Sequence, residues 1–136
     1  MRLRVVTLPV LLLLATSAVW AHRPDARRVP KQANITAACT PGGNPGVNPP
    51  SIAMTRADHI EWGSVSPRAV SWTITPKDPD DWPFEAESFT GTPGSPAVTP
   101  NPLPGALLNH AYGYNVTVVC RDGTSQVIDP DIIIGE

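Results

Sequence analysis

The fold is decided near the end of the chain, by Tyr112-Gly-Tyr-Asn-Val-Thr-Val-Val-Cys120, the dipeptide Asp122-Gly123 and the apolar run Ile132-Ile-Ile134. In the first of these segments every second residue is large and apolar or is the cysteine. Alternation with a period of two is typical of a β-strand with one buried face. Asp-Gly between two such runs is typical of a tight hairpin turn. The segment therefore predicts a core strand that ends in a cysteine and turns back into a hairpin.

Similar runs recur along the chain, and none of its segments combines apolar residues at helical spacing with helix caps. Only one of the 17 prolines, Pro9, precedes residue 22, and the others fall between the β-rich runs. Proline lacks the N–H that a strand donates, so this placement favours strands separated by connections. We predict an all-β fold, a small antiparallel Greek-key β-sandwich with long Pro-rich connections. The expected strands are Asn34–Cys39, Ser51–Thr55, His59–Trp62, Ala69–Thr75, Ala97–Val98, Tyr112–Cys120, Ser125–Ile128 and Asp131–Ile134.

The two longest connections are expected at residues 40–50 and 76–104. The second contains Trp82, Phe84 and Phe89. Aromatic side chains bury a large apolar area, so leaving three of them in water is costly. We expect them to pack as a lid on the open end of the sandwich; the alternative is an exposed aromatic surface that binds a ligand.

The first residues have the pattern of a secretory signal peptide, with Arg2 and Arg4 before an apolar run and, up to Ala21, small or modest side chains at the positions that a signal peptidase reads. The apolar run is shorter than the roughly 20 residues of a membrane-spanning helix and contains Pro9. We predict a signal at residues 1–21, a disordered basic leader at 22–32 and a β-sandwich domain at 33–136. The mature protein is then secreted or periplasmic, with no membrane span after signal cleavage.

Charge argues against nucleic acid as a partner. Residues 32–136 hold 4 basic and 11 acidic residues, a net charge of −7. Affinity for nucleic acid depends largely on Lys and Arg that neutralise phosphates. The basic residues of the leader are expected to form a solvated tether, or a tail that contacts an anionic lipid or polymer.

Cys39 and Cys120 are the only cysteines. In an oxidising compartment a disulfide is the expected state of such a pair. The functional alternative makes Cys120 a thiolate that binds a metal or exchanges disulfides, although the chain has no Cys-x-x-Cys. Both readings are open from the sequence.

Three segments together resemble the cupredoxins, the plastocyanin-type copper β-sandwiches: Asp58-His-Ile-Glu-Trp62, Val70-Ser-Trp-Thr-Ile74 and the Tyr-x-Tyr-x-Val…Cys strand with its closing strand. The resemblance covers about Ser51 to Ile134. It implies one copper-ligating His near the strand at Arg68–Thr75 and a further His, with a Met, soon after Cys120. Neither segment contains His, and no Met follows Cys120. The resemblance therefore favours the fold and disfavours its copper chemistry, since blue copper needs two imidazoles beside the thiolate.

Two other metal sites are conceivable from the sequence. Cleavage after Ala21 makes His22 the first residue, whose amine and imidazole can chelate copper with help from His59 or His110. Five carboxylates crowd the segment 78–87 and supply the hard oxygen ligands that calcium prefers, although prolines interrupt their spacing. We expect a floppy first residue and a solvated acidic turn instead, with no metal and no cofactor. The carboxylates are Asp78, Asp80, Asp81, Glu85 and Glu87.

No nucleophile, base and orienting acid occur in a recognisable pattern, and no Gly-x-Ser-x-Gly is present. Asn34-Ile-Thr36 and Asn115-Val-Thr117 match the glycosylation pattern, which has meaning only in a eukaryote. We expect no enzyme. The expected role is an exported, non-catalytic binding or structural module with an unknown protein or polymer partner. The alternative is a copper-binding or electron-transfer protein of cupredoxin type with an atypical site.

Overall fold

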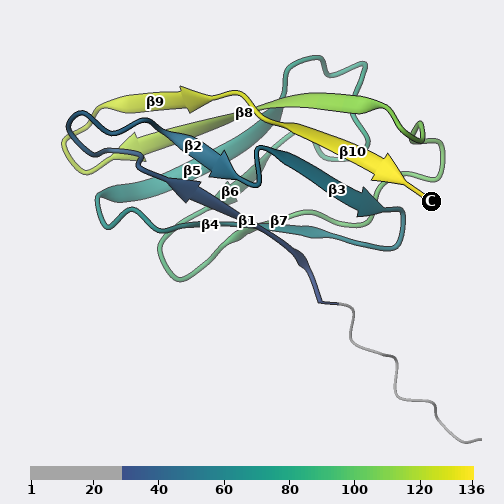
Figure 1. The fold of residues 1–136 in the computed structure, drawn as a ribbon, viewed down its shortest axis with the longest axis horizontal. Helices are drawn as coiled ribbons and strands as arrows, with labels where there is room; N and C mark the ends of the chain where they lie inside the picture. The colour runs from purple at the N-terminus through teal and green to yellow at the C-terminus, as the bar shows by residue number, and fades with distance from the viewer. Residues whose placement is uncertain (1–28) are drawn as a thin grey trace, which may run out of the picture.

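The computed structural model describes residues 29–136, which form two β-sheets packed face to face (Figure 1). This part of the chain contains no helix, so the predicted all-β sandwich is confirmed. The strands are β1 (Lys31–Thr36), β2 (Gly46–Asn48), β3 (Ser51–Thr55), β4 (Ile60–Ser64), β5 (Ala69–Pro76), β6 (Phe89–Gly91), β7 (Ala97–Val98), β8 (Ala111–Cys120), β9 (Ser125–Ile128) and β10 (Asp131–Gly135).

One sheet has the strand order β2-β1-β4-β7, and the other has the order β3-β10-β8-β5-β6 with β9 also paired to β8. Six of these pairings are antiparallel, as expected. The other two, β1 with β4 and β3 with β10, are parallel and were not predicted. Pro49 and Pro50 separate β2 from β3, and neither can donate a ladder hydrogen bond. The chain therefore leaves one sheet after Asn48 and enters the other at Ser51.

Strand β8 is the central strand of the larger sheet. Its first residues pair with β10, its last residues pair with β9, and β5 lines its other edge along most of its length. The alternation predicted for β8 is confirmed, because every residue of its predicted apolar face is buried. These are Tyr112, Tyr114, Val116, Val118 and Cys120, each at most 3% exposed.

The prediction for β5 was wrong at one residue. Val70 was expected to share the buried face of Trp72 and Ile74, but it is 39% exposed, and Ala69 is buried in its place. The pairing with β8 shifts register between Ala69 and Ser71. Such a bulge places one extra residue in the strand and so reverses the face to which the preceding residues point.

The first strand also differs from its prediction. It was expected at Asn34–Cys39, and it runs from Lys31 to Thr36. Lys31 and Gln32, assigned to a disordered leader, pair with Ile60 and Glu61 of β4. At the other end Ala37 and Cys39 adopt positive φ angles of 52° and 63°, outside the strand region, which ends the pairing.

The predicted signal and most of the leader lie outside the described residues. Within residues 29–136 no helix exists that could cross a bilayer. Strands β2 and β6 are three residues long and were missed, since periodicity is not measurable over so short a run.

The three aromatic residues expected to form a lid are buried, since Trp82, Phe84 and Phe89 are 9%, 3% and 9% exposed. Phe89, however, belongs to β6 and pairs with Ile74 of β5, so the aromatic lid consists of Trp82 and Phe84 alone. Trp82 packs edge-on against Phe84 with ring centroids 5.2 Å apart, and it also lies 6.4 Å from the ring of Tyr114. The indole N–H of Trp82 donates to the carbonyl of Ala86 at 2.9 Å, so the connection closes on itself over the core.

A network of three aromatic residues joins the two sheets. Trp62 of β4 donates its indole N–H to the hydroxyl of Tyr114 in β8 at 3.1 Å. Trp72 of β5 donates its indole N–H to the backbone carbonyl of Trp62 at 2.8 Å. All three side chains are at most 2% exposed, and burial raises the pKa of the Tyr114 phenol. Each buried polar atom of this network therefore has its partner inside the core.

We expect Tyr114→Phe to lower the free energy of unfolding by about 1–3 kcal/mol, because it leaves the indole N–H of Trp62 buried without an acceptor. Urea denaturation followed by tryptophan fluorescence measures the change. The control is Val127→Ala, at a side chain that is 62% exposed and should shift the midpoint little. Equal stability of the wild type and Tyr114→Phe would show that the hydrogen bond adds nothing to the core.

Candidate functional site

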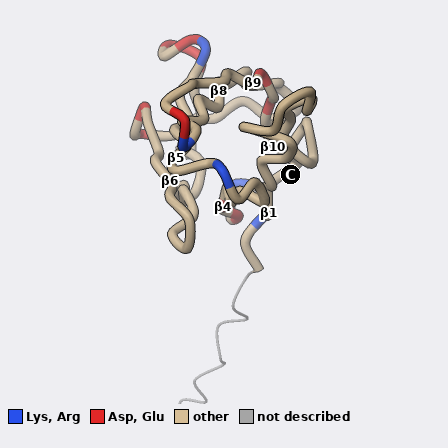
Figure 2. Tube along the Cα trace, turned by 90° about the vertical axis from the view of Figure 1, so that its left-hand side faces the viewer, with Lys and Arg blue, Asp and Glu red and all other residues tan. Residues whose placement is uncertain are grey.

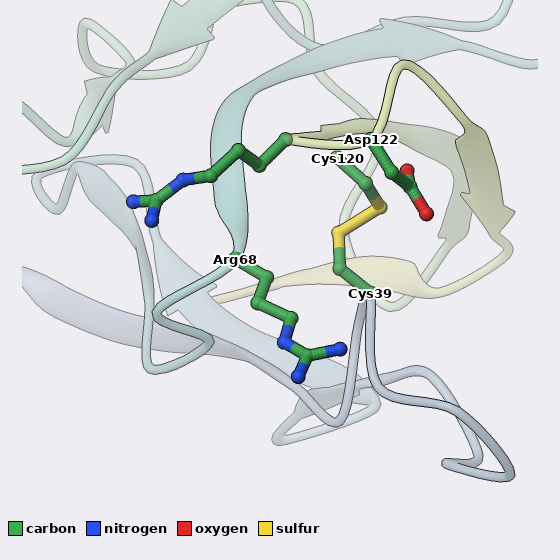
Figure 3. Close-up of a pocket in the computed structure, with 5 residues that line it drawn as sticks. Cys39, Arg68, Cys120 and Asp122 are labelled. Carbon is green, nitrogen blue, oxygen red and sulfur yellow. A yellow bond between two sulfur atoms is a disulfide. The ribbon is translucent and has the colours of Figure 1, made fainter.

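Strand β8 ends at a disulfide, which lines a pocket of about 300 Å³. Cys39, which follows β1, is bonded to Cys120, the last residue of β8, with their Cα atoms 5.4 Å apart. The disulfide expected from the sequence is therefore present, and it links the two sheets at this end. The pocket is lined by Cys39, Arg68, Cys120, Arg121 and Asp122, and we name this surface the disulfide pole (Figure 3).

Local backbone geometry brings Cys39 to the strand end. Its positive φ turns the chain after β1, and its N–H donates to the side-chain carbonyl of Gln126 in β9 at 2.9 Å. On the other side, Cys120 closes the hairpin from β8 to β9, with its N–H donating to the carbonyl of Thr124 at 2.8 Å. Gly123 has a φ of 85°, which suits glycine, so the Asp-Gly turn is confirmed.

Two arginines stand beside the disulfide because their backbones are joined. The N–H of Arg121 donates to the carbonyl of Arg68 at 2.8 Å, although the residues are far apart in sequence. Figure 3 shows Arg68 beside the disulfide, with its side chain on the side of Cys39. Arg121 donates to the carbonyl of Pro67 at 3.4 Å. Both arginines are exposed, and neither forms an ion pair with a carboxylate of the described residues.

Asp122 is the acidic member of the pole. Its Oδ1 accepts hydrogen bonds from the hydroxyl of Thr124 at 2.7 Å and from the Thr124 backbone N–H at 3.0 Å. These bonds, with a smaller contribution from the charge of Arg68, lower the pKa of the Asp122 carboxyl. The carboxylate is therefore ionised but is engaged by its own turn, and the pole keeps an excess of one positive charge.

This excess is notable because the rest of the described chain is acidic. Residues 29–136 contain 5 basic residues, Lys31, Arg56, Arg68, Lys77 and Arg121, against 11 acidic ones. Figure 2, which faces this end of the sandwich, shows the few basic segments set singly on the trace. Lys77 is paired with Asp129, and Arg56 donates to the carbonyl of Ala106 at 2.6 Å. At the disulfide pole, two exposed arginines line one pocket.

The residues considered for copper are not brought together. Cys120 is in the disulfide, so its sulfur is not a free thiolate. His59 lies 3.8 Å from a carboxylate oxygen of Glu61, and His110 lies within 2.9 Å of both carboxylate oxygens of Asp81. His22 is outside the described residues. Within residues 29–136 no three His, Cys, Asp or Glu side chains are grouped as metal ligands.

The acidic segment lies toward the opposite end of the sandwich, where β5 ends and β8 begins. The N–H of Asp80 donates to Oδ1 of Asp78 at 3.0 Å, which forms a local turn. Asp81 is held by His110, whose ring packs edge-on against Tyr112 with centroids 4.7 Å apart. The exposed carboxylates are those of Asp78, Asp80, Glu85 and Glu87, and we call this segment, residues 78–87, the acidic loop.

No protein-family model matches the chain, and no curated protein is significantly similar to it. The site is therefore interpreted from its own geometry.

Sequence reasoning found the two cysteines and the acidic loop but missed the arginine pair and the Asp81–His110 pair. Arg68 precedes a strand and Arg121 follows another, with no motif that links them. Their contact arises from the register of β5 on β8, which pairs Ala69 with Cys120. The one available indication was that Arg68 immediately precedes the expected strand Ala69–Thr75 and Arg121 immediately follows the expected strand Tyr112–Cys120.

Removing the disulfide is expected to destabilise the domain by about 4 kcal/mol, the chain-entropy estimate for a loop closed over most of the domain. Cys39→Ser/Cys120→Ser is compared with the wild type by urea denaturation, with and without reductant. Reductant should weaken the wild type and leave the variant unchanged. A thiol assay on the denatured wild type should find no free thiols before reduction and two after it; two free thiols before reduction would contradict the disulfide.

Proposed function

We propose that this chain is an exported, non-catalytic binding module that engages a negatively charged partner through its disulfide pole. One observation carries the proposal: two exposed guanidinium groups, neither in an ion pair with a carboxylate of the described residues, flank a pocket on an otherwise acidic protein. Arginine in this state is suited to carboxylate or phosphate groups, because its planar fork presents several N–H donors. The disulfide supports the same interpretation, since it constrains the backbone around the pocket, and a preorganised surface loses less entropy on binding.

The likeness to cupredoxins is part of this proposal. The two-sheet sandwich supports a cupredoxin-like Greek-key fold, and the cysteine that the resemblance would assign to copper is oxidised. In this view the end of the sandwich that holds copper in that family carries a disulfide and two arginines here. An electron-transfer copper site is a weaker proposal, because no free thiolate is present at Cys120 and neither described His lies with it.

Export is proposed on two grounds. The first residues match a secretory signal peptide, and the disulfide is consistent with an oxidising compartment such as the periplasm or the cell exterior.

Export predicts that the chain recovered from the periplasm or medium of an expressing cell begins at His22. Intact-mass spectrometry determines the N-terminus. Measured before and after reduction, the mass should increase by that of two hydrogens, because reduction converts the disulfide to two thiols. A chain that retains residues 1–21 would contradict cleavage at Ala21. A matched control replaces Ala21 with Arg, which should block cleavage because the peptidase reads small residues there.

Binding through the disulfide pole predicts that fluorescently labelled poly-glutamate binds the wild type at low ionic strength and is released by salt, since screening weakens exposed charge pairs. Arg68→Gln/Arg121→Gln should weaken this binding about tenfold, at roughly 0.5–1 kcal/mol for each exposed pair. Fluorescence anisotropy measures the affinity.

The control for this measurement is Lys31→Gln, which removes one exposed positive charge at the start of β1, away from the pole. It should leave the affinity nearly unchanged. Equal losses in Lys31→Gln and in the arginine variant would assign the binding to net charge alone. Absence of binding at low ionic strength would contradict the proposed function.

A further inference from the structure

The proposed function leaves open which negatively charged surface the disulfide pole receives. We infer that it receives the acidic loop of a second copy of this chain, which produces weak head-to-tail self-association. This inference rests on the proposed function and adds the identity of the partner.

The first step is the separation of the two surfaces. Ala69 of β5 pairs with Cys120 at the disulfide pole, and Pro76 pairs with Tyr114 near the start of β8. The acidic loop follows Pro76, so it lies beyond the opposite end of these strands. Within one molecule the loop therefore cannot cover the pole. A contact between them must join two copies by different surfaces, which generates a chain or a ring of copies.

The second step is the state of the charges. In the acidic loop, Asp78, Asp80, Glu85 and Glu87 are exposed, and none of them forms an ion pair with a described basic residue. Asp81 is already paired with His110, and the nearby Lys77 is paired with Asp129. Four carboxylates are thus available on one surface and two guanidinium groups on the other, and opposite charges on two surfaces favour their encounter.

The third step is rigidity. The acidic loop is fixed from within by Trp82 and Phe84, which are buried, and by the bond from the indole of Trp82 to Ala86. The N–H of Leu103 also donates to the carbonyl of Pro83 at 2.7 Å. The carboxylates therefore project from an ordered support. Little conformational entropy is lost when such a surface binds.

The fourth step is the contacts of the arginines. Arg121 donates to the carbonyl of Pro67, whereas the charge of Arg68 acts on Asp122, so the two guanidinium groups have different neighbours and are poorly placed to bind one small anion together. They are better placed to receive separate carboxylates from one surface. The acidic loop offers such a set of carboxylates. Along the chain, Asp80 precedes the buried Trp82 and Phe84, and Glu85 and Glu87 follow them.

The test is sedimentation velocity of the mature protein over a range of concentrations at low and at high salt. We expect the weight-average sedimentation coefficient to rise with concentration at low ionic strength. In about 1 M NaCl this rise should vanish, because the screening length falls to roughly 3 Å. A protein that stays monomeric at low salt, or an oligomer that persists unchanged in high salt, would overturn the inference.

Charge-reversal variants locate the contact. Arg68→Glu/Arg121→Glu and, separately, Asp80→Lys/Glu85→Lys/Glu87→Lys should each abolish self-association. Mixing the two variants should restore an equimolar complex, because one supplies an intact acidic loop and the other an intact disulfide pole. No complex in the mixture would overturn the inference. Circular dichroism checks that the variants are folded, and Arg68→Gln/Arg121→Gln provides a milder variant of the pole.

The matched control is Lys31→Glu, compared with the single variant Arg121→Glu. Both make the same change of net charge at an exposed residue, but only Arg121→Glu should reduce self-association, by at least threefold in the association constant. Equal effects would overturn the inference. Asp122→Asn should strengthen self-association, because it removes the negative charge at the pole.

The poly-glutamate measurement separates the two levels of the proposal. If poly-glutamate binds at the arginines while the protein remains monomeric, the proposed function holds and the second copy is excluded as the partner. If neither occurs, both fail.

Discussion

The structure depends on the hydrogen-bonded aromatic network of Trp62, Tyr114 and Trp72. Trp62 comes from one sheet and the other two from the facing sheet, so the network fixes how the layers stack as well as filling the space between them. Its polar atoms are out of water, and each would be costly if its partner moved away. The aromatic lid extends this network, since the ring of Trp82 lies beside Tyr114. A connection of unusual length is thereby held to the core instead of being left mobile.

The disulfide makes a second connection between the layers, at one end of β8. Because the disulfide takes the place of a free thiolate, it changes whether this end of β8 can bind a metal. A cysteine at the end of a core strand can bind a soft metal only while its sulfur is free. Here the sulfur is bonded to Cys39, and the groups that reach solvent around it are the guanidinium groups of Arg68 and Arg121. The groups exposed at this pole are accordingly hydrogen-bond donors that carry positive charge.

Charge distribution links the pole to the opposite end of the molecule. An acidic protein with two arginines at one end, both outside any ion pair of the described residues, has an asymmetric charge distribution. Its two ends therefore present surfaces of unlike charge. The acidic loop is ordered by buried aromatic residues, and one of its carboxylates, Asp81, lies within hydrogen-bond distance of the imidazole of His110. Long-range attraction between such surfaces would act on encounter rates and be sensitive to ionic strength.

The order of residues along the chain determined most of the strands. Alternation in 112–120, and prolines between the apolar runs, were sufficient to predict a two-layer all-β fold, and a pair of cysteines was sufficient to predict the disulfide. Local pattern could not predict the two parallel pairings, the bulge that exposes Val70 or the strand residues Lys31 and Gln32, because each depends on which distant segment lies alongside. The arginine pair is likewise a feature that local pattern could not predict. Arg68 and Arg121 become neighbours only when β5 and β8 pair in one particular register, and register is a property of the assembled sheet.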